Sequence, residues 1–272
     1  MTTSSREFLK IAGVSTLSLI APAILCRPAC SQEKVIIPGD SSLKTKSSGQ
    51  ALTAKRWAMA VTPSKCPDGC TACITACHGV HNVPDFGNRK DEVKWIWQEP
   101  FAAAFPNEKH AYLGESFQKL RLPVLCNHCA NPSCVRVCPT KATFQRPDGI
   151  VMMDYHRCIG CRLCMAACPY GARSMNYRDP QPFIAKRNPD FPAKRNPDFP
   201  TRTRGVVEKC NFCEERLVKG ILPACVTACK EKALIFGDVE NPQSEIRFLL
   251  GKQFNLRRRS QLGTGPQIYY II

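Results

Sequence analysis

The sequence lacks the motifs that mark most nucleotide-using and hydrolytic enzymes. Its 272 residues contain no phosphate-binding loop, no dinucleotide-binding fingerprint and no nucleophile elbow. Acidic residues are also scarce: 22 aspartates and glutamates stand against 38 lysines and arginines, for a formal net charge of +16. No nucleic-acid-binding signature accompanies this charge, so we expect no nucleic-acid partner. We interpret the short basic run 257–259 as a solvated or docking patch.

Hydrophobic runs long enough to span a membrane are missing as well. The apolar stretch from Ile11 to Leu25 falls short of the about twenty residues that a spanning helix needs. Together with its polar, basic start and the Ala21-Pro22-Ala23 site, it predicts a cleaved export signal over residues 1–31. An uncleaved anchor or a buried helix is the alternative. The segment "SREFLK" resembles the twin-arginine export motif, with Ser5 in place of the first arginine.

Cysteine, in contrast, is abundant, with 18 residues. A disulfide scaffold and a metal–thiolate protein are the two explanations. Metal ligation is favoured because C-x-x-C neighbours sit too close together to pair with each other. Cys26 and Cys30 belong to the export segment and are treated as non-ligands. The other cysteines form four tight groups: Cys66, Cys70, Cys73 and Cys77; Cys126, Cys129, Cys134 and Cys138; Cys158, Cys161, Cys164 and Cys168; Cys210, Cys213, Cys225 and Cys229.

The third group has the C-x2-C-x2-C-x3-C-P spacing of bacterial ferredoxins. In that motif the first three cysteines hold one cluster, and the fourth ligates the neighbouring one. The second group ends in the same way, so we expect the two groups to exchange their last cysteines. The predicted ligand sets are Cys126, Cys129, Cys134 with Cys168, and Cys158, Cys161, Cys164 with Cys138.

The first and fourth groups are irregular, but each also ends in x3-Cys. The fourth group alone is compatible with a zinc site. Beside a ferredoxin motif we favour a second exchange, which predicts the sets Cys66, Cys70, Cys73 with Cys229, and Cys210, Cys213, Cys225 with Cys77. Four oxidised [4Fe-4S] centres with their thiolates would lower the net charge to roughly +8.

The order of strand, cysteine group, hairpin and cysteine group is typical of a ferredoxin. Asp148-Gly149 between two short apolar runs predicts the hairpin, and "ALIFGDV" predicts a strand. We therefore expect an α+β fold of two nested bacterial-type double-cluster ferredoxin modules with long loop insertions. The predicted boundaries are a linker at 32–54, an outer module at 55–122 with 201–272, and an inner module at 123–200.

Three further features lie outside the cysteine groups. "AKRNPDFP" occurs twice, at 185–192 and 193–200, and its two prolines per copy predict a duplicated surface loop, with a docking finger as the alternative. His128 and His156 are expected to tune cluster potential rather than to ligate iron. Trp95 and Trp97 are interpreted as packing residues, and residues 78–122 as a long insertion with few regular elements.

The four cysteine groups in this order resemble the four-cluster iron–sulfur subunits of dimethyl-sulfoxide, polysulfide and nitrite reductase complexes. The segments "KWIWQEPF", "CIGCRLCMAACPYG" and "VEKCNFCEERLVKG" narrow the resemblance to the DsrO family. These proteins are the exported ferredoxin-like subunits of the DsrMKJOP (Hme) complexes of sulfate respiration, which are linked to sulfite reduction. The resemblance covers residues 56–272.

The resemblance implies an electron-transfer subunit with four [4Fe-4S] clusters and no catalytic residues of its own. It implies a peripheral position on the outer face of the cytoplasmic membrane. The implied partners are an NrfD-like membrane quinone-site subunit (DsrP type), a multihaem cytochrome c (DsrJ type) and the other subunits of the complex. Two alternatives remain open: an electron-transfer subunit of a molybdopterin oxidoreductase, and a zinc-dependent interaction module.

Overall fold

The computed structural model describes residues 50–272, except 109 and 185–194. The chain divides into two units, 1–43 and 44–272, and the described residues belong to the second. The predicted export signal, Cys26, Cys30 and most of the linker at 32–54 lie outside the described residues. None of the helices in the described ranges is both long and apolar enough to cross a membrane.

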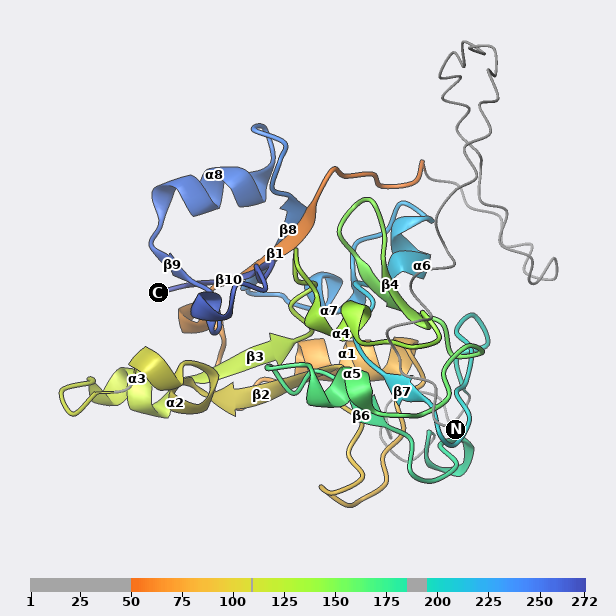
Figure 1. Cartoon of the computed structure of the whole chain (residues 1–272). Helices are drawn as coiled ribbons and strands as arrows, with labels where there is room; N and C mark the ends of the chain where they lie inside the picture. Colours follow the sequence, from red (N-terminus) through yellow and green to blue (C-terminus); the bar gives the residue numbers. More distant parts are fainter. Residues whose placement is uncertain (1–49, 109, 185–194) are drawn as a thin grey trace, which may run out of the picture. The chain divides into compact units, whose positions relative to one another are not determined.

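A four-stranded sheet with the order β8-β1-β10-β9 joins the two ends of the described chain. β1 (Trp57–Val61) pairs antiparallel with β8 (Leu234–Asp238) and parallel with β10 (Ile268–Ile271), and β9 (Asn255–Leu256) pairs with β10. The predicted strand "ALIFGDV" is therefore confirmed. α8 (Glu245–Lys252) packs on β1 and β8 (Figure 1).

All five residues of β1 are buried, although only one face carries large apolar side chains. Trp57, Met59 and Val61 enter the main core, whereas Ala58 and Ala60 face a smaller cluster around Ile246 of α8. The alanines leave room for the helix on the second face. Both faces of β1 are therefore buried, the large residues against the main core and the alanines against α8.

The predicted insertion contains more regular structure than its sequence indicates. β2 (Ile96–Pro100) pairs antiparallel with β3 (Arg121–Leu125), and α2 (Phe101–Ala104) and α3 (Glu115–Lys119) lie between them. Trp95 and Trp97 are buried beside or within β2, which confirms their packing role. The Trp95 indole donates to Glu208 Oε2 at 2.9 Å.

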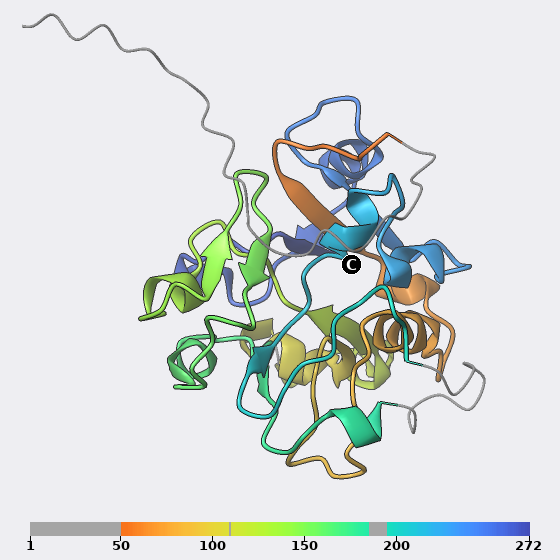
Figure 2. The ribbon, with the colours of Figure 1, turned by 90° about the vertical axis from the view of Figure 1, so that its right-hand side faces the viewer.

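Two short antiparallel pairs account for the other strands in the described residues. β4 (Thr143–Gln145) pairs with β5 (Val151–Met153), and β6 (Ser174–Met175) pairs with β7 (Val207–Glu208). The first is the predicted hairpin, with Gly149 at a φ of +85° in its turn; its two arms are visible in Figure 2. This positive φ favours glycine, because side chains with a Cβ rarely adopt it.

Short helices carry cysteines of the four groups. α1 (Ala72–Val80) of the first group packs against α7 (Ala224–Thr227) of the fourth, and α4 (Ser133–Arg136) of the second packs against α5 (Leu163–Ala166) of the third. This mixture of helices and small sheets agrees with the predicted α+β class. The remaining helical turns are α6 (Glu214–Leu217) and the 3-10 turns Pro63–Lys65, Pro106–Glu108, Gln181–Phe183 and Ser260–Leu262.

The structure adds detail to one surface prediction and revises another. In the second "AKRNPDFP" copy, Phe199 is buried against His81 and Trp95, and Asn196 donates to Val80 O at 2.7 Å. These two residues anchor the described part, 195–200, whereas Arg195, Pro197, Asp198 and Pro200 are exposed, as expected of a surface loop. In the basic run 257–259, Arg258 is buried and pairs with Glu99 at 2.8 Å, so it is not a solvated residue.

Candidate iron–sulfur centres

The same backbone feature recurs in all four cysteine groups. The residue immediately before the second cysteine has a positive φ: Gly69 (71°), His128 (40°), Gly160 (68°) and Phe212 (57°). A left-handed residue reverses the chain locally, which lets two cysteines separated by two or three residues face one point. Gly160 is also required sterically, because a Cβ would lie 2.3 Å from Gly205 O.

The first thiol set combines the first and fourth groups. Cys66, Cys70, Cys73 and Cys229 line one cavity. Burial raises the pKa of the Cys66 thiol to about 11, and the neighbouring Cys229 and Cys70 raise it as well. The last cysteine of the fourth group therefore lies with the first group, so the fourth group does not form a four-cysteine zinc site by itself.

The second thiol set is the most deeply buried one. Burial raises the pKa of Cys77 well above its usual value, and Cys213, Cys210 and Cys225 raise it further. All four of these cysteines are buried. Backbone amides support two of the sulfurs: Phe212 N lies 3.4 Å from Cys210 Sγ, and Ala224 N lies 3.3 Å from Cys213 Sγ.

The third thiol set combines the second and third groups. Burial raises the pKa of Cys129 to about 12, and Cys126, Cys134 and Cys168 contribute further increases. Burial likewise raises the pKa of Cys168, next to Cys126 and Cys134. The last cysteine of the ferredoxin-like motif thus lies beside the second group rather than with Cys158 and Cys161.

The fourth thiol set is the most accessible. Cys138, Cys158, Cys161 and Cys164 line a small cavity, and Cys161 is the one exposed cysteine among the described residues. Burial tends to raise the pKa of Cys138, but hydrogen bonds from Thr143 and Thr140 outweigh it and lower the value. Ile159 and Leu163 beside Cys161 are 67% and 50% exposed.

Electrostatic influence links the four thiol sets one to the next, and we call this order the row. Cys73 of the first set influences Cys225 and Cys77 of the second. Cys126 of the third set raises the pKa of the buried Cys210 of the second. Cys134 of the third set similarly acts on Cys164 of the fourth. The fully buried second set and the third set, with Cys126 and Cys134 buried, therefore lie inside the row, and the more accessible sets lie at its ends.

The thiols suit a polycationic ligand. The sixteen described cysteines are free, and in each set at least one thiol has a pKa raised by burial and neighbouring thiols, although the Cys138 pKa is lowered. Four thiolates cannot stay ionised together in such a place without positive charge between them. A [4Fe-4S] core supplies that charge and takes four thiolate ligands. The donor set therefore fits the cluster that the spacing predicts.

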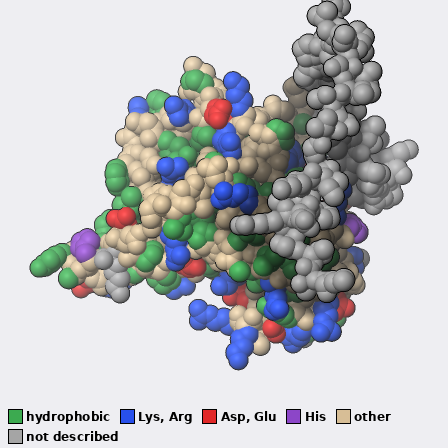
Figure 3. Space-filling view, viewed as in Figure 1, with side chains coloured by type: hydrophobic (Ala, Val, Ile, Leu, Met, Phe, Trp, Pro, Cys, Tyr) green, Lys and Arg blue, Asp and Glu red, His purple; other side chains and the backbone are tan. Residues whose placement is uncertain are grey.

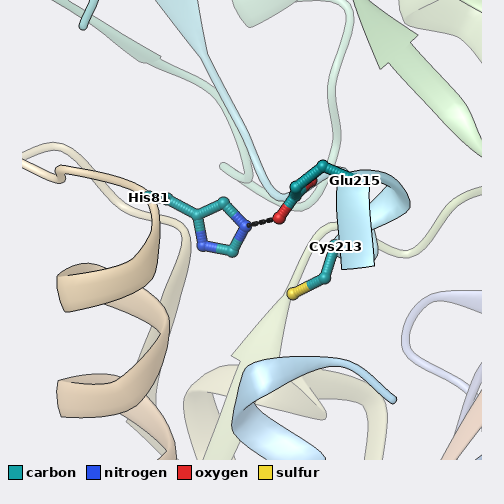
Figure 4. Close-up of side chains that lie close together, drawn as sticks. All are labelled: His81, Cys213 and Glu215. Carbon is teal, nitrogen blue, oxygen red and sulfur yellow. Dashed lines mark hydrogen bonds and ion pairs between the residues drawn. The ribbon is translucent and has the colours of Figure 1, made fainter. Parts of the chain in front are cut away.

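A mixed set of possible metal ligands lies beside the second thiol set. His81, Cys213 and Glu215 have ligand atoms within 4.8 Å of one another. Figure 4 shows the His81 ring pointing at Glu215, with the Cys213 sulfur nearby; the Nε2–Oε1 distance is 3.0 Å. Cys213 is shared with the thiol set of Cys77, and His81 Nδ1 lies 2.8 Å from Cys77 O. We therefore interpret His81 and Glu215 as outer neighbours of that set.

Sequence reasoning missed most of the polar residues around the sulfurs. His81 lies 3.5 Å from Cys77 Sγ, and Arg173 lies 3.0 Å from Cys134 Sγ. Lys209 is fully buried and donates to Cys210 O at 2.6 Å. Only the C-P-Y-G-A-R and E-K-C contexts place Arg173 and Lys209 near cysteines in the sequence.

The two histidines predicted to tune the clusters differ. His128 is buried, stacks on Phe212 at 3.7 Å, and accepts from Val151 N at 3.0 Å. Burial lowers its pKa well below the usual value, and Lys209 and Arg173 lower it further. His156 is exposed. Their tuning roles stay predictions. Basic side chains outnumber acidic ones on the face in Figure 3, in keeping with the net charge.

Comparisons with known proteins agree with this chemistry. Residues 117–181 and residues 157–234 each match the 4Fe-4S dicluster domain. The chain is 37% identical to an Hdr-like menaquinol oxidoreductase iron–sulfur subunit 1 of Archaeoglobus fulgidus, covering 98% of this chain and 97% of the relative. It is 36% identical to a menaquinone reductase iron–sulfur cluster-binding subunit of Nitratidesulfovibrio vulgaris (79% and 88%) and to a polysulfide reductase subunit of Wolinella succinogenes (80% and 95%).

Proposed function

Because the chain belongs to the family of iron–sulfur electron-transfer subunits of membrane-associated quinone, polysulfide and dimethyl-sulfoxide-type oxidoreductases, we propose that it carries four [4Fe-4S] clusters. Each cluster would be held by one thiol set, with the last cysteine of each group supplied to the neighbouring set. The observation that carries this proposal is the row of four thiol sets, each drawn from two cysteine groups.

Bound iron–sulfur clusters accept and release single electrons. The protein's part is to hold the four centres in sequence, to exclude water from the inner ones and to leave the outer ones reachable. Water is kept from the inner centres by the burial of their ligands Cys77, Cys134, Cys210 and Cys225. The outer centres stay reachable because Cys161 is exposed and Cys66 and Cys70 are only half-buried. The nesting of an inner module within an outer one is part of the proposal, supported by the contacts of α1 with α7 and of α4 with α5.

We further propose that the chain is a DsrO-type subunit of a sulfite-reduction-linked complex, at the outer face of the cytoplasmic membrane. An NrfD-like quinone-site subunit and a multihaem cytochrome c would be its partners. The words menaquinol and menaquinone in the names of two relatives support a quinone-linked role. A molybdopterin oxidoreductase is the second candidate, supported by the polysulfide and dimethyl-sulfoxide reductase relatives.

Purification of the native membrane complex separates the two candidates. A complex that contains covalently bound haem c and no molybdenum supports the sulfite-linked assignment. Stoichiometric molybdenum would support the second candidate and overturn the first.

Metal analysis of the purified chain should find about sixteen iron atoms and about sixteen acid-labile sulfides per chain. The reason is the sixteen free cysteines, which form four sets of four. Iron and sulfide assays, combined with zinc determination by mass spectrometry, provide the measurement. Stoichiometric zinc with little iron would contradict the proposal.

The chain should lie outside the cytoplasm, because residues 1–31 have the pattern of an export signal. External protease added to intact spheroplasts should degrade it, while a cytoplasmic marker protein remains whole. Replacing Arg6 by lysine should retain the chain in the cytoplasm if the twin-arginine route is used. Protection from protease until the cells are lysed would argue against export.

A further inference from the structure

Arg173 is a buried cation whose side-chain partners are one cysteine sulfur, one methionine sulfur and a hydroxyl. It is 4% exposed and directly precedes β6. One terminal nitrogen, Nη2, lies 3.0 Å from Cys134 Sγ and donates to Thr143 Oγ1 at 2.7 Å. The other, Nη1, lies 3.8 Å from Met153 Sδ. The guanidinium is thus fixed from both ends of its fork.

The charge of Arg173 is balanced by thiolates rather than by a carboxylate. Burial lowers the pKa of Arg173, but Cys134, Cys126 and Cys164 raise it and produce a net increase. Cys126 and Cys134 belong to the third thiol set, whereas Cys164 belongs to the fourth. Arg173 also lowers the pKa of Cys164, against the increase caused by burial. Met153, which Nη1 approaches, lines the cavity of the fourth set, so the guanidinium lies between the third and fourth sets.

A fixed positive charge at such a place favours the more negative of two redox states. Reduction adds one negative charge to an iron–sulfur centre, so a nearby guanidinium makes the reduced form more stable and raises the reduction potential. Arginine keeps its charge throughout the accessible pH range. Since Arg173 is buried, water screens this effect only weakly.

We propose that the charge of Arg173 raises the reduction potentials of the third and fourth centres. The effect is larger for the third centre, which Cys134 would ligate. The proposal rests on the four-cluster function proposed above. As a consequence, the four centres differ in reduction potential, and an electron resides preferentially on the centres of the second and third cysteine groups. The first and second centres, held by the Cys66 and Cys77 sets, should be nearly insensitive to Arg173.

The test is a redox titration of the iron-loaded protein, followed by electron paramagnetic resonance. Arg173→Gln removes the charge but keeps hydrogen-bonding capacity. We expect the reduction equilibrium of the Cys134 centre to shift at least tenfold toward the oxidised form, about 59 mV for a one-electron couple. Arg173→Lys keeps the charge and should restore most of the potential.

Arg178→Gln is the matched control. Arg178 lies five residues further along the chain, is 44% exposed, and pairs with Asp91 at 3.2 Å. Its replacement removes the same charge from the same segment without touching a sulfur, and should leave all four potentials unchanged. Equal shifts in both arginine variants, or unchanged potentials in an Arg173→Gln protein with full iron content, would overturn the inference.

A second variant covers the case in which Arg173→Gln loses iron. Thr143→Val retains the charge but removes the hydroxyl that holds the guanidinium. A severalfold shift of the same two centres toward the oxidised form is then expected, in protein with full iron content. A shift of the Cys66 and Cys77 centres as large as that of the third and fourth centres would overturn the inference. A wild-type protein without iron–sulfur signals would instead overturn the four-cluster function itself.

Discussion

Replacing Cys168 by serine should remove or alter the centre held by Cys126, Cys129 and Cys134, and should leave the Cys158 centre intact. Cys168 follows Cys164 by four residues in the sequence, yet its thiol lies beside Cys126 and Cys134. A serine oxygen is a harder ligand than a thiolate and binds iron–sulfur clusters poorly. Iron analysis should show a loss of up to about four iron atoms, and paramagnetic resonance should show the change in one centre only.

Cys138→Ser is the reciprocal control. Cys138 ends the second group but lines a cavity with Cys158, Cys161 and Cys164. Its replacement should therefore affect the centre of the third group and spare the one that Cys168→Ser alters. If Cys168→Ser instead altered the Cys158 centre and Cys138→Ser altered the Cys126 centre, each group would keep its own fourth cysteine, and the exchanged arrangement would be abandoned.

The spacing of the cysteines carried much of the prediction. A run such as Cys158-x2-Cys161-x2-Cys164-x3-Cys168-Pro169 is constrained by the size of the cluster, so its pattern survives in the sequence. The same holds for the hairpin at Gly149, where one residue type fits the turn. These local signals do not depend on the rest of the chain.

Contacts over long sequence distances could not be predicted in the same way. β2 and β3 pair across a stretch with no strong local signal, and His81 meets Glu215 134 residues away. The left-handed backbone of Phe212 is another case, because a bulky residue rarely adopts it and nothing in its identity indicates it. The role of Arg173 likewise could not be predicted, because it depends on contacts with Thr143 of β4 and Cys134 of the second cysteine group.

Replacing Glu208 by glutamine should strongly destabilise the folded chain. Glu208 and Arg202 are both fully buried and form an ion pair at 2.6 Å. The variant leaves the Arg202 guanidinium without a counter-charge, which typically costs about 3–5 kcal/mol. Arg202 also donates to the carbonyl oxygens of His81 and Asn82, which follow the helix that carries Cys73 and Cys77. The centre held by Cys77 should therefore be lost early during unfolding.

Urea unfolding, followed by tryptophan fluorescence and by the loss of cluster absorbance, provides the measurement. With a denaturant dependence of about 2–3 kcal/mol per molar urea, the midpoint should fall by about 1–2.5 M. Glu115→Gln is the matched control, because Glu115 pairs with Lys119 on the surface, where the two side chains are 82% and 79% exposed, and should not change the midpoint. A double variant, Arg202→Met with Glu208→Leu, removes both charges and should recover part of the loss. A Glu208→Gln midpoint equal to that of Glu115→Gln would mean that the buried pair does not stabilise the fold around the Cys77 set.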